Sequence, residues 1–478
     1  MNSQNPNWFH GTNTRETLGG PRPVKQVKSA VIGLIGTAPA GPVNTHVLVS
    51  SETAAAQFGP ELPGFTIPQA LRAIADHGVM SVVVINVLDP SAHTTQVTGE
   101  IINLQDGGRL AHGFVSHVTV KDNLGNTTYS VDKDYTLDAQ AGIITPVTGG
   151  ALASATNVLV TYGWADPSKV TAADIIGSVN ASGRRSGILA LDDVFSDLGF
   201  DSKILIAPTY CTQASVAAAL SVMADKLGAV AYVDAPVGCS VQQVLAGRGP
   251  KGTINFNTSS DRVRLCYPHL KVYDPVTNTD RLEPLSVRAA ALRARVDLDE
   301  GYWVSSSNHE IKGVTGMERP ISARIDDETC EANLLNEAGV TTVFNSFGTG
   351  IRLWGNRNAA FPTSTHITSF ENVRRTADIF NESLRLTSLQ YMDQSLSDAL
   401  VDSILGMAEN YARTMLGDGA LLGFKVWYDK ARNTRSELGA GHLRISYKIT
   451  PSVPMEWLTY EAEITDEYVM NIKSGGGK

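Results

Sequence analysis

Fully apolar segments alternate with amphipathic ones along much of the chain. The apolar segments have the length of strands, and the segments between them repeat apolar residues at the spacing of one helix face. This order is typical of a mainly parallel sheet that helices cover on both faces. We therefore predict an α/β multidomain protein whose mainly parallel α/β core is formed by residues 27–95 and 166–346. The expected strands are 27–36, 79–88, 203–208 and 229–236, and the expected helices are 68–78 and 213–227, the second capped by Thr212.

A different pattern interrupts this core between residues 96 and 165. Polar and apolar residues alternate there with a period of two, which is typical of half-buried strands, and glycine-containing turns separate the segments. The alternation is clearest at 117–122, 127–138 and 157–164. We predict a small all-β domain that is inserted in the core and exposed at its surface, where insertions are best tolerated.

After residue 346 the pattern changes to long helices followed by strands. Two helices are expected at 371–392 and 397–416, and two strands at 423–429 and 442–450. We predict that residues 347–454 form an α+β C-terminal domain.

Both ends of the chain have the pattern of extended arms. Residues 1–26 are polar and interrupted by glycine and proline, with no period long enough to build a core. Residues 455–472 alternate as a strand does, but no later strand in the chain could pair with them. We predict an N-terminal arm at 1–26 and a C-terminal arm with a mobile glycine-rich tail at 455–478.

Composition excludes several classes of function. The chain has 39 Lys and Arg against 48 Asp and Glu, a net charge of −9, whereas direct nucleic-acid binding requires a basic face. The strongest apolar run, 79–88, is half of the ~20 residues that a membrane helix needs, so no membrane insertion is expected. The four cysteines do not have zinc or redox spacing, and no secretory signal precedes the core, which indicates folding in a reducing cytoplasm.

No coherent catalytic set is visible in the sequence. Residues 247–252 match GxGxxG, but they follow a helical pattern rather than a strand, and Pro250 removes one N–H from a phosphate cradle. Asp192–Asp193 and the acids at 326–328 could supply paired carboxylates, although acids near helix starts usually interact with the helix dipole. We predict a protein that is not an enzyme and uses no cofactor and no metal.

Several short segments, in this order and spacing, resemble the tail sheath proteins of contractile bacteriophage tails. They include a helix with an Ala-Arg pair, an acidic turn with a Trp, an NEAG segment, a GIRxWGNR segment and an NVRRT segment on the first long helix. The resemblance covers nearly the whole chain except the β insertion. The residues that carry it are Ala294-Arg295, 299–303, 336–339, 350–357, 372–376, Asn433-Thr434, Gly441, Pro451 and Pro454, together with 20–23 and 29–39.

This resemblance implies a structural subunit that stacks as hexameric rings around a tail tube. The cylinder would shorten when the baseplate signals, and would drive the tube through the bacterial envelope for genome delivery. The implied partners are further copies of this chain, the tail tube protein, and the baseplate and tail terminator proteins. The implied location is the virion tail, after assembly in the host bacterial cytoplasm.

The resemblance also implies that both arms pair with strands of neighbouring subunits. We expect the C-terminal half from about Phe347 to face inward and the β insertion to lie outermost. The expected arm residues are Arg15, Val24, Val27, Trp457, Tyr460, Ile464 and Tyr468, and the expected acceptor residues are Val426, Trp427, Leu443, Ile445 and Tyr447. The basic residues Lys425, Lys430, Arg432 and Arg435 either face an acidic tube or form a solvated loop.

Two alternatives to a phage sheath remain at this point. One is a sheath of a related machine, either a phage-tail-like bacteriocin or a secretion system, although secretion sheaths of this kind are divided between two chains. The other belongs to a different class: an α/β hydrolase or nucleotide-dependent enzyme with the β insertion as its substrate domain, whose ligand pocket would lie at the carboxyl ends of the strands.

Overall fold

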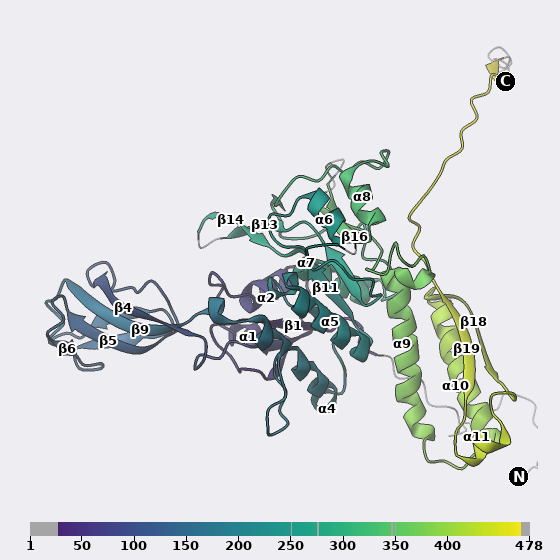
Figure 1. Cartoon of the computed structure of the whole chain (residues 1–478), viewed down its shortest axis with the longest axis horizontal. Coiled ribbons are helices and arrows are strands. Elements are labelled where there is room, and N and C mark those ends of the chain that lie inside the picture. Colours follow the sequence, from purple (N-terminus) through teal and green to yellow (C-terminus); the bar gives the residue numbers. More distant parts are fainter. Residues whose placement is uncertain (1–26, 250, 275–276, 346–347, 349, 470–478) are drawn as a thin grey trace, which may run out of the picture.

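The molecule is elongated, with three regions in a row along its long axis (Figure 1). A small β region lies at one end, an α/β core in the middle, and two long helices with a hairpin at the other end. This computed structural model describes residues 27–249, 251–274, 277–345, 348 and 350–469.

The core sheet is mainly parallel, as the alternation of strands and helices predicts. In the described chain it has eight strands, of which the six central ones run parallel and the two edge strands, β2 and β17, run antiparallel. The central strands are buried on both faces, which explains why they are apolar throughout. Their order is β17 (Arg352–Trp354), β16 (Val340–Phe344), β12 (Val263–Cys266), β11 (Val230–Asp234), β10 (Ile204–Ile206), β1 (Ile32–Gly36), β3 (Val82–Asn86) and β2 (His46–Val49).

Helices cover both faces of this sheet and build two separate apolar clusters. The N-cap of the helix α5 (Ala214–Leu227) is Gln213, so the prediction that Thr212 caps this helix is wrong. The Thr212 hydroxyl instead donates to the carbonyl of Thr209 within a 3₁₀ turn, η3 (Tyr210–Thr212). One face carries α1 (Glu52–Ala56), α2 (Ile67–Asp76) and α7 (Leu285–Asp299); the other carries α3 (Ala172–Ile176), η2 (Gly187–Asp193), α4 (Val194–Leu198), α5 (Ala214–Leu227), α6 (Val241–Gly247) and α8 (Glu331–Glu337).

Two smaller β regions project from the core, the first made of a four-stranded and a two-stranded sheet and the second of a three-stranded sheet. The first is the predicted all-β insertion, which has an apolar cluster of its own around Val120, Val160 and Tyr162. Its first strand begins at Thr94, two residues before the expected boundary, and the division of the chain into domains stays a prediction. The insertion contains β4 (Thr94–Asn103), β5 (Val115–Asp122), β6 (Thr128–Tyr129), β7 (Tyr135–Asp138), β8 (Ile143–Pro146) and β9 (Asn157–Ala165); the second region contains β13 (Leu270–Asp274), β14 (Thr279–Glu283) and β15 (Gly316–Met317).

The C-terminal region contains the two predicted helices and the two predicted strands. These are α9 (Glu371–Ser388), α10 (Asp398–Gly417), β18 (Leu421–Tyr428) and β19 (Ile445–Pro451), with α11 (Arg435–Gly439) between the strands. The strands pair antiparallel and pack on the helices, where the rings of Phe380 and Tyr411 stack with centroids 5.4 Å apart. The first helix ends at Ser388, earlier than expected, and a 3₁₀ turn, η5 (Leu389–Tyr391), follows it.

The two ends of the described chain differ from each other. Val27 is buried among Ile379, Phe380 and Tyr411, so it belongs to the core of its own C-terminal helices. The predictions that Val27 begins a core strand and that it lies in a donated arm strand are therefore wrong, and the first strand begins at Ile32. Residues 455–466, in contrast, leave the body in an extended course without a strand partner in the described chain, and a turn follows at 467–469 (Figure 1).

Candidate assembly site: the arm bases and the hairpin

One face of α9 is charged and buried against the α/β core. Glu371, Arg375, Asp378 and Glu382 follow one another at spacings of four, three and four residues, so they form a single stripe along the helix. Each of them is buried and pairs with an oppositely charged residue of the core. We call these four pairs the ionic seam: Glu371 with Arg264, Arg375 with Asp297, Asp378 with Arg262, and Glu382 with Lys203.

The Arg375–Asp297 pair lies at the centre of the ionic seam. Two guanidinium nitrogens of Arg375 donate to the two carboxylate oxygens of Asp297, at 2.8 and 2.6 Å. Arg293, one turn before Asp297 on α7, donates to the same carboxylate at 2.8 Å. Burial alone would raise the pKa of Asp297, but the charges of Arg375 and Arg293 outweigh it and the pKa lies below its ordinary value.

The Glu371 carboxylate is also both hydrogen-bonded and paired with a positive charge. It accepts the hydroxyl of Tyr232 at 2.5 Å and a guanidinium N–H of Arg264. Burial would raise the pKa of Glu371, and the charge of Arg264 lowers it to below its ordinary value. The remaining donors of Arg264 bind Thr341, Ser306 and the carbonyl of Gly355. Buried charges with all their partners in place fix one geometry, because any displacement leaves a charge unpaired in a medium of low dielectric constant.

The first turns of α9 also hold the chain next to both predicted arms. The amide of Asn372 donates to the carbonyl of Ser452 at 3.0 Å and to that of Trp303 at 2.8 Å. Arg375, one turn later, donates to the carbonyl of Ser29 at 3.0 Å. The bases of the N-terminal and C-terminal arms therefore meet on the same helix, within one turn of each other.

The C-terminal arm is last fixed to its own subunit at Glu456. Its carboxylate accepts two N–H groups of Arg357, at 3.1 and 2.6 Å, and the guanidinium lies 3.5 Å from the ring centroid of Phe370. Arg357, Asn372 and Trp303 all belong to segments that carry the family resemblance, and the structure gives these segments a shared task at the arm bases.

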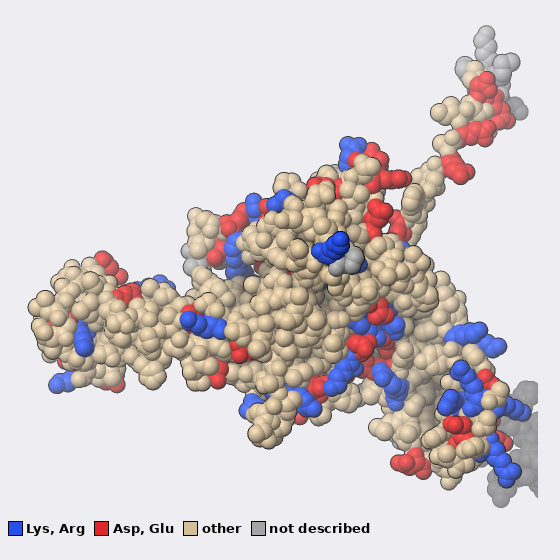
Figure 2. Space-filling view, viewed as in Figure 1, with Lys and Arg blue, Asp and Glu red and all other residues tan. Residues whose placement is uncertain are grey.

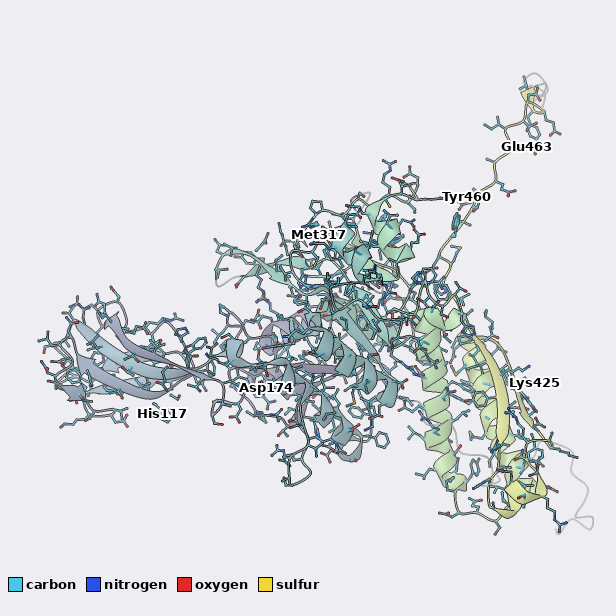
Figure 3. All side chains as sticks on the ribbon, viewed as in Figure 1. His117, Asp174, Met317, Lys425, Tyr460 and Glu463 are labelled. Carbon is cyan, nitrogen blue, oxygen red and sulfur yellow. The ribbon has the colours of Figure 1, made fainter. Side chains whose placement is uncertain are left out.

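Beyond Glu456 the arm carries large apolar side chains into solvent. Trp457, Tyr460 and Ile464 are 74%, 84% and 99% exposed, and Tyr468 is 67% exposed. Figure 3 shows Tyr460 and Glu463 on the arm, clear of the rest of the molecule. A contiguous run of exposed apolar residues of this kind marks an interaction site.

The hairpin of β18 and β19 has two different faces and two open edges. In the described chain each strand pairs only with the other, so the outer edge of each offers unpaired N–H and C=O groups. One face packs on α9 and α10 through Phe424, Val426 and Ile449. Residues of the other face include Lys425 and Lys448, whose ammonium groups lie 5.5 and 5.9 Å from the ring centroid of Trp427.

The structure brings together only part of the predicted assembly residues. Arg15 and Val24 lie outside the described residues. Of the acceptor residues, Val426, Trp427, Ile445 and Tyr447 belong to the hairpin, whereas Leu443 precedes β19 and the prediction that it lies in a strand is wrong. Tyr447 faces the helices, where its hydroxyl donates to Asn381 at 2.6 Å.

The four basic candidates lie at the same end of the molecule but not in one cluster. Lys425 lies on the hairpin, Lys430 and Arg432 follow β18 in the connection, and Arg435 begins α11. All four are exposed, and Figure 2 shows Lys and Arg gathered over this region. Lys425 thus belongs to a sheet face, whereas the other three belong to the connection between β18 and β19, which includes α11.

The segments that suggested enzyme chemistry have structural tasks. The GxGxxG match does not begin a helix, because Gly247 ends α6. Its Arg248 instead connects neighbouring segments by donating to the carbonyls of Ala338, Ala359 and Phe361. Asp192 and Asp193 pair with basic neighbours. Among the described residues, no group of three or more His, Cys, Asp or Glu side chains could hold a metal, and no helix is long and apolar enough to cross a membrane.

Sequence reasoning missed the ionic seam and the two arm bases. The stripe on α9 was visible as charged residues at helical spacing, which is the signal that could have found it. Its partners come from distant parts of the chain and carry no pattern of their own.

Comparisons with known proteins point to one family. The phage tail sheath protein central domain matches residues 168–359, and the phage tail sheath C-terminal domain matches residues 363–465. A tail sheath protein of Burkholderia phage BcepMu is 58% identical over 473 residues, which cover 98% of this chain and 99% of that protein. A tail sheath protein of Escherichia phage P2 is 30% identical over 303 residues, which cover 63% of this chain and 73% of that protein.

Solved structures share the fold at much lower identity. The helical sheath of the anti-feeding prophage in its contracted state has a TM-score of 0.59 at 16% identity, and covers 96% of this chain and 99% of that chain. The contracted sheath complex of an extracellular contractile injection system, PVC, has the same TM-score and coverage at 13% identity.

Removing the central charge of the ionic seam should destabilise the fold. We expect Asp297→Asn to lower the free energy of unfolding by about 3–5 kcal/mol, because it leaves Arg375 and Arg293 buried without a counter-charge. Asp299→Asn is the matched control: the same change on the same helix, in an exposed pair with Arg295. Denaturant unfolding measures both variants, and equal midpoints would contradict the role of the seam.

The ionic seam should also make stability depend on acidic pH. The pKa values of Asp297 and Glu371 lie below their ordinary values in the folded chain, so the stabilisation is complete above about pH 4 to 5. It is lost as the pH falls through the depressed folded values, where both carboxylates take up protons. Asp297→Asn should flatten this dependence in unfolding experiments below pH 5, and an unchanged slope would show that other carboxylates cause it.

Proposed function

The chain belongs to the contractile phage tail sheath family, and from this membership we propose that it stacks as hexameric rings around a tail tube and contracts to drive the tube through a bacterial envelope. Its relatives are structural tail sheath proteins, so the alternative of an α/β enzyme is dropped. The full-length likeness to a phage protein favours a phage virion over a bacteriocin.

Two observations support the proposed assembly: the C-terminal arm has no strand partner in the described chain, and the hairpin of β18 and β19 has no further strand at either edge. Residues 457–469 are exposed, and both outer edges of the hairpin are open in the described chain. An extended segment that adds to a sheet edge satisfies the backbone groups of both. We propose that Trp457, Tyr460, Ile464 and Tyr468 are donated to a neighbour, and that Val426, Trp427, Ile445 and Tyr447 lie in the acceptor hairpin.

Strand addition suits a joint that has to hold while subunits rotate. Each backbone hydrogen bond contributes a net ~0.5–1.5 kcal/mol, so one donated strand contributes a few kcal/mol. The same joint repeated around every ring ties the cylinder together. The chain can bend where the donated strand leaves the body after Glu456, while the ionic seam keeps the body rigid.

The orientation of the subunit follows from its long axis. We propose that the region 347–454 faces the tube and that the β insertion, 96–165, lies outermost, because the two lie at opposite ends of the molecule (Figure 1). The α/β core, 27–95 with 166–346, would lie between them. Baseplate and tail terminator proteins would contact the terminal rings, and assembly would take place in the host cytoplasm before the sheath becomes part of the virion tail.

Contraction needs no cofactor in this proposal. An extended cylinder that is trapped behind a barrier releases free energy when its subunits rotate into new contacts. Contact with the tube has to break during this step, which favours a small polar interface over a broad apolar one. Lys430, Arg432 and Arg435, in the connection between β18 and β19, are the proposed tube-facing residues.

The arm proposal is tested by deleting residues 1–20. We propose that the N-terminal arm is donated as well, and expect a folded protein that no longer forms tubes, because Val27 and Ser29 still anchor the chain whereas most of that arm is gone. Circular dichroism checks the fold, and negative-stain microscopy of the purified protein checks for striated tubes. Tubes of normal appearance from the truncated chain would overturn the proposal.

The tube-facing proposal is tested by neutralising the loop. Lys430→Gln with Arg432→Gln should weaken assembly on a tail tube but leave polymerisation without a tube unchanged. Lys121→Gln with Lys133→Gln, two exposed lysines of the β insertion, is the control with the same change of charge. If the loop variant loses both kinds of assembly equally, the assignment is rejected.

A further inference from the structure

Between Leu458 and Ile464 the C-terminal arm has one apolar and one acidic side when extended. In a strand, successive side chains point to opposite sides. Leu458, Tyr460 and Ile464 share one side of the arm, and Glu461 and Glu463 share the other. From Glu456 to Glu467 the segment contains five acidic residues and no Lys or Arg (Figure 2).

The hairpin carries an unbalanced pair of lysines on its outer face. Lys425 and Lys448 stand directly opposite each other in the antiparallel register, and both are exposed. Like charges in directly opposite positions destabilise a sheet. Neither lysine forms an ion pair with another residue in the described part of the chain, and Figure 3 shows Lys425 on the flank of the hairpin that lies farther from α9.

The two patterns match if the arm becomes a further strand of this sheet. A strand added at an edge continues the two faces of the sheet, so its side chains join one face or the other in alternation. The apolar side of the arm would extend the helix-facing side, which contains Phe424, Val426 and Ile449. The acidic side would then come to the side of the two lysines.

We propose that the C-terminal arm of a second copy of this chain adds to the hairpin with Glu461 and Glu463 on the face of Lys425 and Lys448. This inference rests on the proposed strand exchange and adds the side chains that set its orientation. A slip of one residue would turn the glutamates toward the apolar side and leave the lysines unpaired, so the charges select the register as well as the partner.

Charge also decides which arm is bound beside the lysines. The N-terminal segment 15–27 contains Arg15, Arg22 and Lys25 against a single acid, Glu16, so it has the same sign as the hairpin face. The C-terminal arm has the opposite sign. Lys425 is therefore assigned to the arm-binding face, apart from Lys430, Arg432 and Arg435 in the connection between the two strands.

Reversing the charges on either side tests the inference in the full-length chain. Glu461→Lys with Glu463→Lys should raise the concentration needed for tube formation about tenfold or more, because attraction is replaced by repulsion in every joint. Lys425→Glu with Lys448→Glu should have the same effect, and the four changes together should restore assembly to near its original concentration. Sedimentation and negative-stain microscopy measure the assembly.

The control reverses two charges elsewhere. Asp106→Lys with Glu328→Lys changes two exposed acids outside the arm, and should leave assembly unchanged. The arm variant should fold normally, because residues 461 and 463 are exposed on the arm beyond its ion pair at Glu456. Tubes at the original concentration from the arm variant, or no recovery in the folded fourfold variant, would overturn the inference.

A deletion separates this inference from the proposed function. Removal of residues 457–478 should abolish tubes if strand exchange holds the sheath. If that deletion abolishes tubes while charge reversal has no effect, strand exchange stands and the charge-based orientation falls. If the deletion leaves tubes intact, the proposed role of the arm falls with it.

Discussion

The charges along one face of α9 have to be paired, because each is buried between the helix and the α/β core. Glu371, Arg375, Asp378 and Glu382 fix the position of this helix, since a displacement would leave a buried charge without its partner. The other face of α9 carries α10 and the hairpin, and its first turns hold both arm bases. The geometry of every proposed joint between subunits therefore depends on the ionic seam.

The structure separates the parts that have to stay rigid from those that have to reach a neighbour. The body is closed by paired charges and by apolar clusters on both faces of the sheet. The arm beyond Glu456 has neither paired charges nor an apolar cluster. It exposes large apolar side chains, which is unfavourable in an isolated subunit. Such a division suits a polymer whose subunits move as bodies while their connections persist.

The sequence predicted the elements much better than it predicted how they meet. Apolar strands alternating with helices indicated a parallel sheet because a strand buried on both faces must be apolar throughout. Local exceptions followed local chemistry: the backbone conformation made Gln213 the N-cap in place of Thr212, and Leu443 was left before the strand.

The ionic seam could not be predicted because Lys203, Arg262, Arg264 and Asp297 become partners of α9 only through folding. Val27 was misassigned for a related reason, since an apolar residue does not indicate which core will bury it. The pairing of the arm depends on a second chain, and the sequence gives only its alternating pattern.

The closeness of the two arm bases has a mechanical consequence. Asn372 and Arg375 hold Ser452 and Ser29 within one helical turn, so the two proposed tethers pass close to each other on this helix before they leave the body beyond Glu456 and Val27. A body attached at one point can swing through a large angle while the anchorage itself hardly moves. In the proposed cylinder, α9 would act as a pivot, because both arms are held close together on this helix. The rotation of a subunit would then put little tension on the lattice that connects it to the rest, and the strands would stay paired as the cylinder changes shape.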